Sequence, residues 1–317
     1  MSDQPLAGGV CELNLTGGML THRTGNGYGI TIARSYTKTS TALATFTMTG
    51  GLLDQAMMLW YGNWTQNGII LGKVGTMANV GGTALATFSI SGGTVTNSGQ
   101  FILGGGPGAT GVVVQTGGTI QQASGSPAAQ SYLTIGWGGG CGLYTLAGGS
   151  VTAKRNVFVG GLFTSDLGYV PTDIAFTNDS MGTLRIDSGS FAVTNANLYL
   201  GRNGTGTLVI GTNGVCTAKD VSLGTNTQST VRFEFGPDGT GTLTASGKLT
   251  VGESSKLEVD TTAYTGNAAR IKLIDCSTRE GAFAPENITL QGRGFVRQDK
   301  DEDIWLYRVK GTVVGIL

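Results

Sequence analysis

Hydrophobic and polar residues alternate along most of this chain in short runs. The stretch "TALATFTMTGG" at residues 41–51 returns almost unchanged as "TALATFSISGG" at 83–93, which is 42 residues further along the chain. Each copy alternates apolar with small polar residues and ends in paired glycines, the pattern of a short β-strand that runs into a tight corner. A repeat of this kind indicates a structural unit that is stacked, because a catalytic motif is normally needed once.

A second regularity is an apolar residue at the centre of the strand that follows each glycine pair. Because side chains alternate between the two faces of a strand, these apolar side chains are expected to share one inward-facing column. The column consists of Leu20, Leu53, Val95, Ile120, Val151, Phe191 and Cys216.

A third recurring strand reads apolar–x–apolar and usually ends in glycine. The closing glycines at 104, 136, 160, 201, 224 and 252 are separated by 23 to 41 residues, which predicts a coil of about 23–25 residues that often carries an insertion. The predicted inward pairs include Phe101 and Leu103, Leu133 and Ile135, Val157 and Val159, Leu198 and Leu200, and Val221 and Leu223.

The strand before the glycine pair completes the repeat, with inward pairs such as Phe46 and Met48, or Tyr144 and Leu146. Gln115 and Gly211 interrupt this column by one residue, which predicts local bulges at both places. Three short strands per repeat predict an all-β fold, a parallel β-solenoid (β-helix) with three strands in each coil. The alternative is an antiparallel sandwich or propeller, which the "NG" dipeptides would favour if they joined matched strands.

The pattern changes near residue 252, where longer and more charged strands such as "KLEVD" and "DIWLYRV" begin. We therefore expect glycine-rich coils over 1–252, with loop insertions at 54–68, 121–131 and 161–182. Residues 253–317 are expected to form a C-terminal β subdomain that caps the coils or assembles with another copy.

Composition narrows the fold class further. Glycine makes up 55 of 317 residues without the three-residue period and the proline content of collagen, and the alternating apolar runs argue against disorder. No apolar run is long enough to span a bilayer. The first residues lack the basic start and apolar stretch of a signal peptide, so we expect a mature chain, an engineered fragment or a protein made without that signal.

The sequence offers little for catalysis. Asp54 is the only carboxylate between Glu12 and Asp166, so half of the chain cannot supply an acid/base pair, and the later acids read as exposed surface residues. His22 is the only histidine, and the four cysteines lack CxxC spacing. We expect no enzyme activity, no cofactor or metal site, no nucleic-acid partner and no membrane span.

One dense aromatic segment, "MMLWYGNW" at 57–64, could bind a ligand through Trp60, Tyr61 and Trp64, or could pack its own loop against the coils. Ranks of outward threonines could order water as in ice-binding proteins, but the threonine array is irregular, so ice binding ranks low.

The stretch "GTLRIDSGSFAVTNANLYLGRNGTGTLVIGTNGVCTAKDVSLG" at 182–224 resembles the glycine-rich repeats of autotransporter-type passenger β-helices and related bacterial surface proteins. The later "IKLIDCSTREGAFAPENITLQGRG" resembles the segment that often ends such arrays. The resemblance implies an extracellular or cell-surface solenoid, commonly an adhesin or a filament component. The chain departs from that family in showing neither a membrane barrel nor an export signal.

Charge suggests a partner. Residues 1–165 carry six Lys/Arg and three Asp/Glu, whereas 166–317 carry fourteen and seventeen, so the two halves have opposite net charge. This polarity favours a head-to-tail homopolymer, with the strand Val313, Val314, Ile316 and Leu317 either docking on a neighbour or packing on its own subdomain. The expected function is that of a structural surface protein, a filament or an adhesin stalk. The alternatives are a fibre module that binds glycans or a host receptor and, less favoured, a carbohydrate-active enzyme.

Overall fold

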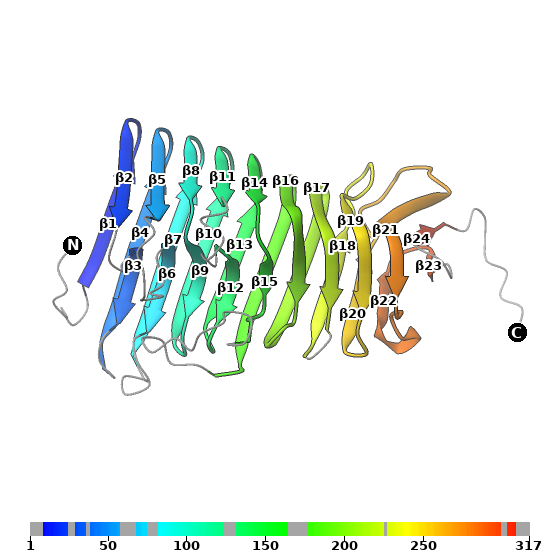
Figure 1. Ribbon diagram of the computed structural model, residues 1–317. Helices are drawn as coiled ribbons and strands as arrows, with labels where there is room; N and C mark the ends of the chain where they lie inside the picture. Colours follow the sequence, from blue (N-terminus) through cyan, green and yellow to red (C-terminus); the bar gives the residue numbers. More distant parts are fainter. Residues whose placement is uncertain are drawn as a thin grey trace, which may run out of the picture.

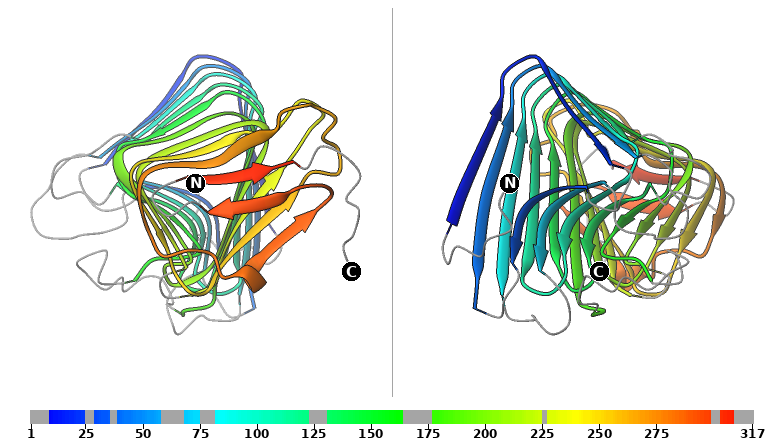
Figure 2. Two further views of the ribbon diagram at one scale, coloured as in Figure 1. Left: turned by 90° about the vertical axis from the view of Figure 1, so that its right-hand side faces the viewer. Right: turned by 60° about the vertical axis from the view of Figure 1, so that its left-hand side comes forward.

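The chain is a stack of β-coils, as the computed structural model in Figure 1 shows. The structure describes residues 9–24, 29–35, 39–57, 68–74, 82–122, 131–163, 177–224, 227–298 and 303–308. Antiparallel pairing among these residues is confined to β21–β24 and β23–β24, and the other ladders are parallel. The predicted parallel β-solenoid is therefore confirmed, and the antiparallel sandwich or propeller is wrong. Seen along the stack, the coils superimpose into one outline (Figure 2).

Three parallel ladders form the sides of the stack. The first ladder contains β1 (Gly9–Leu15), β4 (Thr41–Met48), β7 (Thr83–Ile90), β10 (Ala109–Gln115), β13 (Cys141–Leu146), the beginnings of β16 (Ser180–Leu200) and β17 (Gly204–Leu223), β18 (Ser229–Glu234), β20 (Ser255–Asp260) and β22 (Ile288–Gln291).

The second ladder contains β2 (Met19–Thr24), β5 (Leu52–Met57), β8 (Thr94–Asn97), β11 (Thr119–Gln122), β14 (Ser150–Ala153), the middle of β16 and β17, β19 (Thr242–Val251) and β21 (Arg270–Glu280). The third contains β3 (Ile30–Ser35), β6 (Gly68–Val74), β9 (Gln100–Gly105), β12 (Leu133–Trp137), β15 (Val157–Val159) and the later parts of β16, β17, β19 and β21.

The duplicated stretch is one strand in two successive coils. β4 pairs with β7 in unbroken register, from Thr41 opposite Thr83 to Met48 opposite Ile90. Phe46 and Phe88 consequently stack with ring centroids 4.5 Å apart and planes 3° apart. The shortest coils follow later, because Ser180 pairs with Gly204, 24 residues further on. Of the insertions predicted at 54–68, 121–131 and 161–182, residues 58–67, 123–130 and 164–176 lie outside the described residues, and the rest belong to β5, β6, β11 and β16 or to short stretches beside strands.

The predicted inward columns form the core. Val95, Ile120 and Val151 pair in register in adjacent coils and are fully buried. Leu20 differs, because its side chain is 36% exposed although it pairs with buried Leu53. It lies in the first described coil, where a neighbouring strand packs on one side only. The other predicted core residues are buried, namely Leu53, Phe191, Cys216, Phe101, Leu103, Leu133, Ile135, Val157, Val159, Leu198, Leu200, Val221 and Leu223.

Of the two predicted bulges, one is present and one is wrong. The β16–β17 register shifts between Ile186 and Ser188, at the place where Gly211 was expected to add a residue. At Gln115 the ladder is unbroken, with Ile90 and Leu146 as its partners. Gln115 points inward because its amide has partners there: it accepts a hydrogen bond from Tyr144 Oη at 2.5 Å and donates to the carbonyls of Gly118 and Ser150.

The glycines that close the third-ladder strands at 104, 136, 160, 201 and 224 sit at a left-handed corner. Gly160 has φ +82°, and a Cβ there would clash with the backbone of Thr205 in the next coil. Glycine is therefore required at such a position both for its backbone angle and for space. In the first coil the same corner is occupied by Ala33, at φ +58°, opposite Gly72 of β6.

The C-terminal end closes the stack. Parallel pairing continues past residue 252, the boundary expected from the sequence, as far as β22. The chain then turns back through β23 (Phe295–Gln298) and β24 (Ile304–Tyr307), and β24 pairs antiparallel with both β23 and β21. Figure 2 shows these strands lying across the end of the coils. Ile304 and Leu306, on the inner side of β24, are fully buried and belong to the main core cluster.

Candidate functional site

The sequence-predicted candidates lie in three environments. Apart from the exposed Leu20, the residues of the core columns are interior and present no side chain to a ligand. Trp60, Tyr61 and Trp64, and the strand of Val313, Val314, Ile316 and Leu317, fall outside the described residues. His22 and the acidic residues are discussed below, because the structure gives them partners that the pattern did not reveal.

His22 belongs to a row of polar side chains at the end of the second-ladder strands. Its Nδ1 lies 2.6 Å from Oε1 of Gln55 in the next coil, and Gln55 pairs in turn with Asn97. Asn97 Nδ2 donates to Gln122 Oε1 at 2.8 Å. Gln55, Asn97 and Gln122 are fully buried, and the row continues as Ala153, which carries no hydrogen-bonding group. The row binds neighbouring coils together and explains His22 structurally.

The four cysteines have free thiols. Cys216 lies in the core column, where burial raises the pKa of its thiol to about 12. A thiol with a raised pKa is a poor nucleophile because the thiolate is the reactive form. Cys276 is likewise buried, Cys141 is half-buried and Cys11 is exposed.

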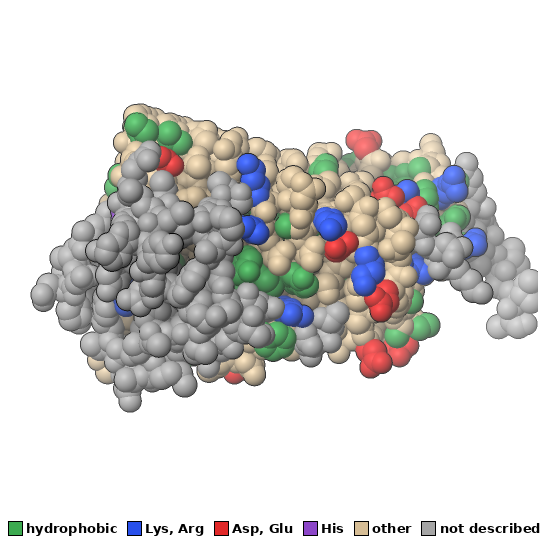
Figure 3. All heavy atoms as spheres, in the orientation of Figure 1, with side chains coloured by type: hydrophobic (Ala, Val, Ile, Leu, Met, Phe, Trp, Pro, Cys, Tyr) green, Lys and Arg blue, Asp and Glu red, His purple; other side chains and the backbone are tan. Residues whose placement is uncertain are grey.

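Charged side chains gather on the outer face of the first ladder in its later coils. Arg185 of β16 contacts Asp187 at 2.7 Å and Glu234 of β18 at 2.6 Å. Arg232 then contacts Glu234 at 3.0 Å and reaches toward the carboxylates of β20. The hydrogen bond to Glu234, followed by that to Asp187, raises the pKa of Arg185. In Figure 3 acidic and basic side chains are interleaved over the C-terminal part of the visible face.

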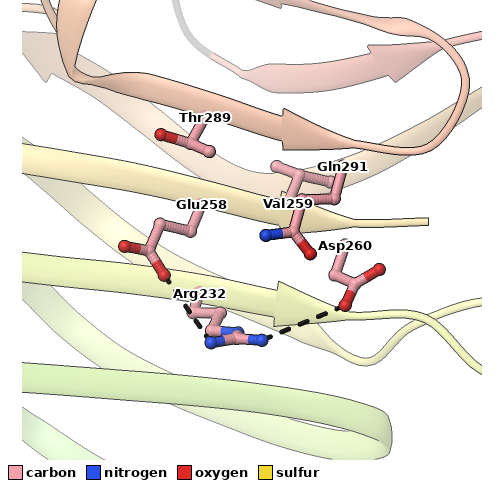
Figure 4. A pocket seen from close by; sticks show the side chains of 6 residues that line it. All are labelled: Arg232, Glu258, Val259, Asp260, Thr289 and Gln291. Carbon is pink, nitrogen blue, oxygen red and sulfur yellow. Dashed lines mark ion pairs between the residues drawn. The ribbon is translucent and has the colours of Figure 1, made fainter. Parts of the chain in front are cut away.

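The ion pairs of Arg185 and Arg232, which we call the charge ladder, border a shallow pocket (Figure 4). Arg232 lies at its base, 3.8 Å from Glu258 and 3.9 Å from Asp260, and Thr289 and Gln291 of β22 complete the rim. The pocket holds about 90 Å³ of space, well below the roughly 300–1,000 Å³ of typical small-molecule sites. It can accept a single polar group, such as one hydroxyl or carboxylate of a larger molecule.

The electrostatics of the pocket do not suit general acid catalysis by Asp260. Hydrogen bonds from the side chain and then the backbone of Thr262, together with nearby Arg232, lower the pKa of the Asp260 carboxyl. A general acid at neutral pH needs a raised carboxyl pKa, so the environment favours an ionised, ion-paired Asp260. Within the parts of the chain that the structure describes, no group of three or more His, Cys, Asp or Glu side chains is placed to hold a metal ion.

A second cluster covers the C-terminal end, and we call it the end face: Phe295, Trp305 and Tyr307 together with Arg270, Lys272 and Arg297. It is the outer side of the antiparallel strands β21, β24 and β23. Trp305 lies 5.0 Å from the Arg270 guanidinium and 5.1 Å from Lys272 Nζ, and Tyr307 stacks on Phe295 at 5.4 Å. Phe295 is 48% exposed. Lys272 also pairs with Asp275 and Asp303 at 2.9 and 2.8 Å.

Both clusters escaped the sequence analysis. The acids were expected to be scattered, yet the ladder register places Arg232 opposite Glu258, and Glu234 opposite Asp260. Extending the repeat alignment to "KLEVD" would have revealed that pairing. For the end face, the signal was basic residues that alternate with apolar ones in "RIKL", "FVRQ" and "IWLYR", three segments that the sequence analysis did not place side by side.

No helix among the described residues has the length and hydropathy to cross a membrane. Comparison with known proteins found no similar one: no family model, no curated protein and no solved structure matches this chain. The fold and the geometry of its surfaces therefore carry the functional argument.

Proposed function

We propose that this chain is a non-enzymatic structural protein of the cell surface or extracellular space, an adhesin stalk or a filament component. The observation that carries the proposal is the uninterrupted core, which runs from Phe46 in the early coils to Leu306 at the closed end. Each coil contacts its neighbours through three ladders at once, so the stack behaves as one stiff rod that displays long flat sides.

The two ends of the rod differ, which bears on how it would assemble. At the C-terminal end, β24 and β23 lie across the coils, and β24 pairs with β21, the last parallel strand of the second ladder. At the other end, the described strands β1, β2 and β3 each pair with a strand on one side only. Such edges accept an added strand readily. A head-to-tail contact would therefore join an open edge to the end face.

The proposal is tested by locating the protein and imaging it. Immunogold labelling of intact cells that make the protein should decorate the cell surface or extruded material, and negative-stain microscopy should show rods or end-to-end strings. Label confined to the cytoplasm would contradict a surface role. Incubation with a panel of neutral and acidic polysaccharides should leave them uncut, whereas metal-dependent cleavage would establish an enzyme instead.

The end face favours a second candidate, a fibre module that binds an acidic glycan. Aromatic rings provide flat apolar surface, and exposed guanidinium groups such as those of Arg270 and Arg297 can pair with carboxylates. Binding of a polyuronate to the full chain, measured by calorimetry, should weaken at least tenfold in the double variant Trp305→Ala and Arg270→Ala. The matched variant Arg232→Ala, on the side of the rod, should bind as the parent does. Equal binding by all three proteins would rule out this candidate.

A further inference from the structure

The outer face of the first ladder is divided along its length. Ion pairs occupy the later strands, but the earlier strands present an in-register row of six residues that contains no charge. We call it the apolar row: Val10, Leu43, Leu85, Thr110, Cys141 and Met181.

The row is open to solvent. Val10 is 75% exposed, Met181 57%, Leu85 43% and Leu43 38%, so four of the nine large exposed apolar side chains of the described residues belong to it. Val114, two rows across on β10, is also 36% exposed. Scattered apolar side chains are normal on a protein surface, but a contiguous row along successive strands marks a contact surface.

The size of this surface can be estimated from strand spacing. Six strands about 4.8 Å apart and three outward residues per strand, about 6.8 Å apart, define roughly 500 Å². The apolar row makes up about a third of this face, and two such faces together bury roughly 1,000 Å², the lower limit for a specific interface. We propose that the apolar row is the contact face of a lateral dimer of this chain, in which two solenoids pack side against side.

Charge selects the arrangement of the two copies. Glu12 of β1 lies in the row next to the apolar row, and Arg185 of β16 lies at the far end of the same face. A two-fold axis parallel to the strands places β1 of one copy opposite β16 of the other. The apolar rows then cover one another, and Glu12 lies opposite Thr183, one row away from Arg185. An axis along the solenoid would instead place Glu12 against its own copy and the apolar row against polar Asn14 and Thr47, which is unfavourable.

This inference adds a partner to the proposed structural role, and its readout is the oligomeric state of the pure chain rather than its location in the cell. Sedimentation velocity should show a monomer–dimer equilibrium with a dissociation constant in the micromolar range. The double variant Leu43→Glu and Leu85→Glu should remain monomeric at concentrations at least a hundredfold higher. The control pair Thr96→Glu and Gln121→Glu, which changes the second ladder in adjacent coils, should dimerise like the parent. Far-UV circular dichroism and melting curves confirm that both variants are folded.

A cross-link tests the geometry. The two-fold axis places Leu43 of one copy opposite Cys141 of the other, with sheets about 10 Å apart. In a Cys11→Ser background, Leu43→Cys with a short bismaleimide should give a covalent dimer in denaturing gels, whereas Thr152→Cys on the second ladder should not. A parent chain that stays monomeric, or a dimer that persists in the Leu43→Glu and Leu85→Glu variant, would overturn the proposal. A dimer that Leu43→Cys cannot cross-link would overturn the two-fold arrangement.

Discussion

The early and late coils of this solenoid share one interior and differ on one outer face. Inside, Phe88 of β7 and Phe233 of β18 are both fully buried on the first ladder. Outside, β4 and β7 expose leucine and threonine, whereas β18 and β20 expose arginine, glutamate and aspartate. The difference teaches that inward positions specify the coil, while outward positions are free to carry separate surface properties.

The largest effect is expected from a charge placed inside the shared core. Val151→Asp would bury an unpaired carboxylate between Ile120 and Phe191 and should cost at least about 3 kcal/mol in the free energy of unfolding. Chemical denaturation measures this loss. Thr152→Lys, on the outer side of the same strand, should change stability by less than about 0.5 kcal/mol. Similar melting of parent and Val151→Asp would show that this strand does not face inward.

Substitutions at the glycine corner should change stability in opposite directions in the first coil and in a later coil. Gly160→Ala combines a left-handed backbone with a clash against Thr205, so we expect a loss of at least about 2 kcal/mol. Ala33→Gly removes the left-handed strain of an alanine and should raise stability by about 0.5–1 kcal/mol. Thermal denaturation of both variants provides the comparison. A loss of stability in Ala33→Gly would mean that the corner of the first coil is not strained.

Substitutions of Gln115 and Tyr144 should affect stability together, because the two side chains share a buried hydrogen bond. Gln115→Leu leaves the buried Tyr144 hydroxyl without its acceptor, which should cost about 1–3 kcal/mol. Tyr144→Phe removes the orphaned hydroxyl, so the double variant should be more stable than Gln115→Leu alone. Additive losses in a double-mutant cycle would argue against a direct bond between the two side chains.

The smallest effect is expected from acid, which should weaken the late coils before the early coils. The pKa of Asp260 is lowered chiefly by Thr262, and that of Asp275 chiefly by Lys272. A carboxyl with a lowered pKa in the folded state contributes stability above its unfolded pKa, roughly 3.9, and loses it as the pH falls through the folded value. Between about pH 5 and pH 2, the protection of backbone amides against hydrogen exchange should therefore fall in β20 and β21 before it falls in β4 and β7. Uniform loss of protection would contradict the assignment.

The sequence predicted the interior well because burial imposes a strict period on each strand. Apolar alternation identified the columns of Val95 and Phe101 without any structure. The same rule failed at Gln115, because period alone cannot show that an inward amide will find three partners in adjacent coils. It also failed at Leu20, where the position is inward but, among the described residues, a strand pairs with β2 on one side only. The charge ladder and the end face depend on contacts across the stack, so they emerge only when the repeat alignment is extended past residue 252 and the strands are placed side by side.

The number of residues per coil varies, but this variation does not change the length of the solenoid. One coil takes 42 residues, from Thr41 to Thr83, and another takes 24, from Ser180 to Gly204. Each of these coils nevertheless lengthens the stack by one strand spacing of about 4.8 Å. Because loop closure costs only about 0.6 kcal/mol for each doubling of loop length, insertions at the corners leave that advance unchanged. The length of the molecule is thus set by its number of coils and not by its number of residues. Its reach would be altered by adding or deleting a whole coil, while loops of almost any length could be attached along it as side groups at fixed intervals.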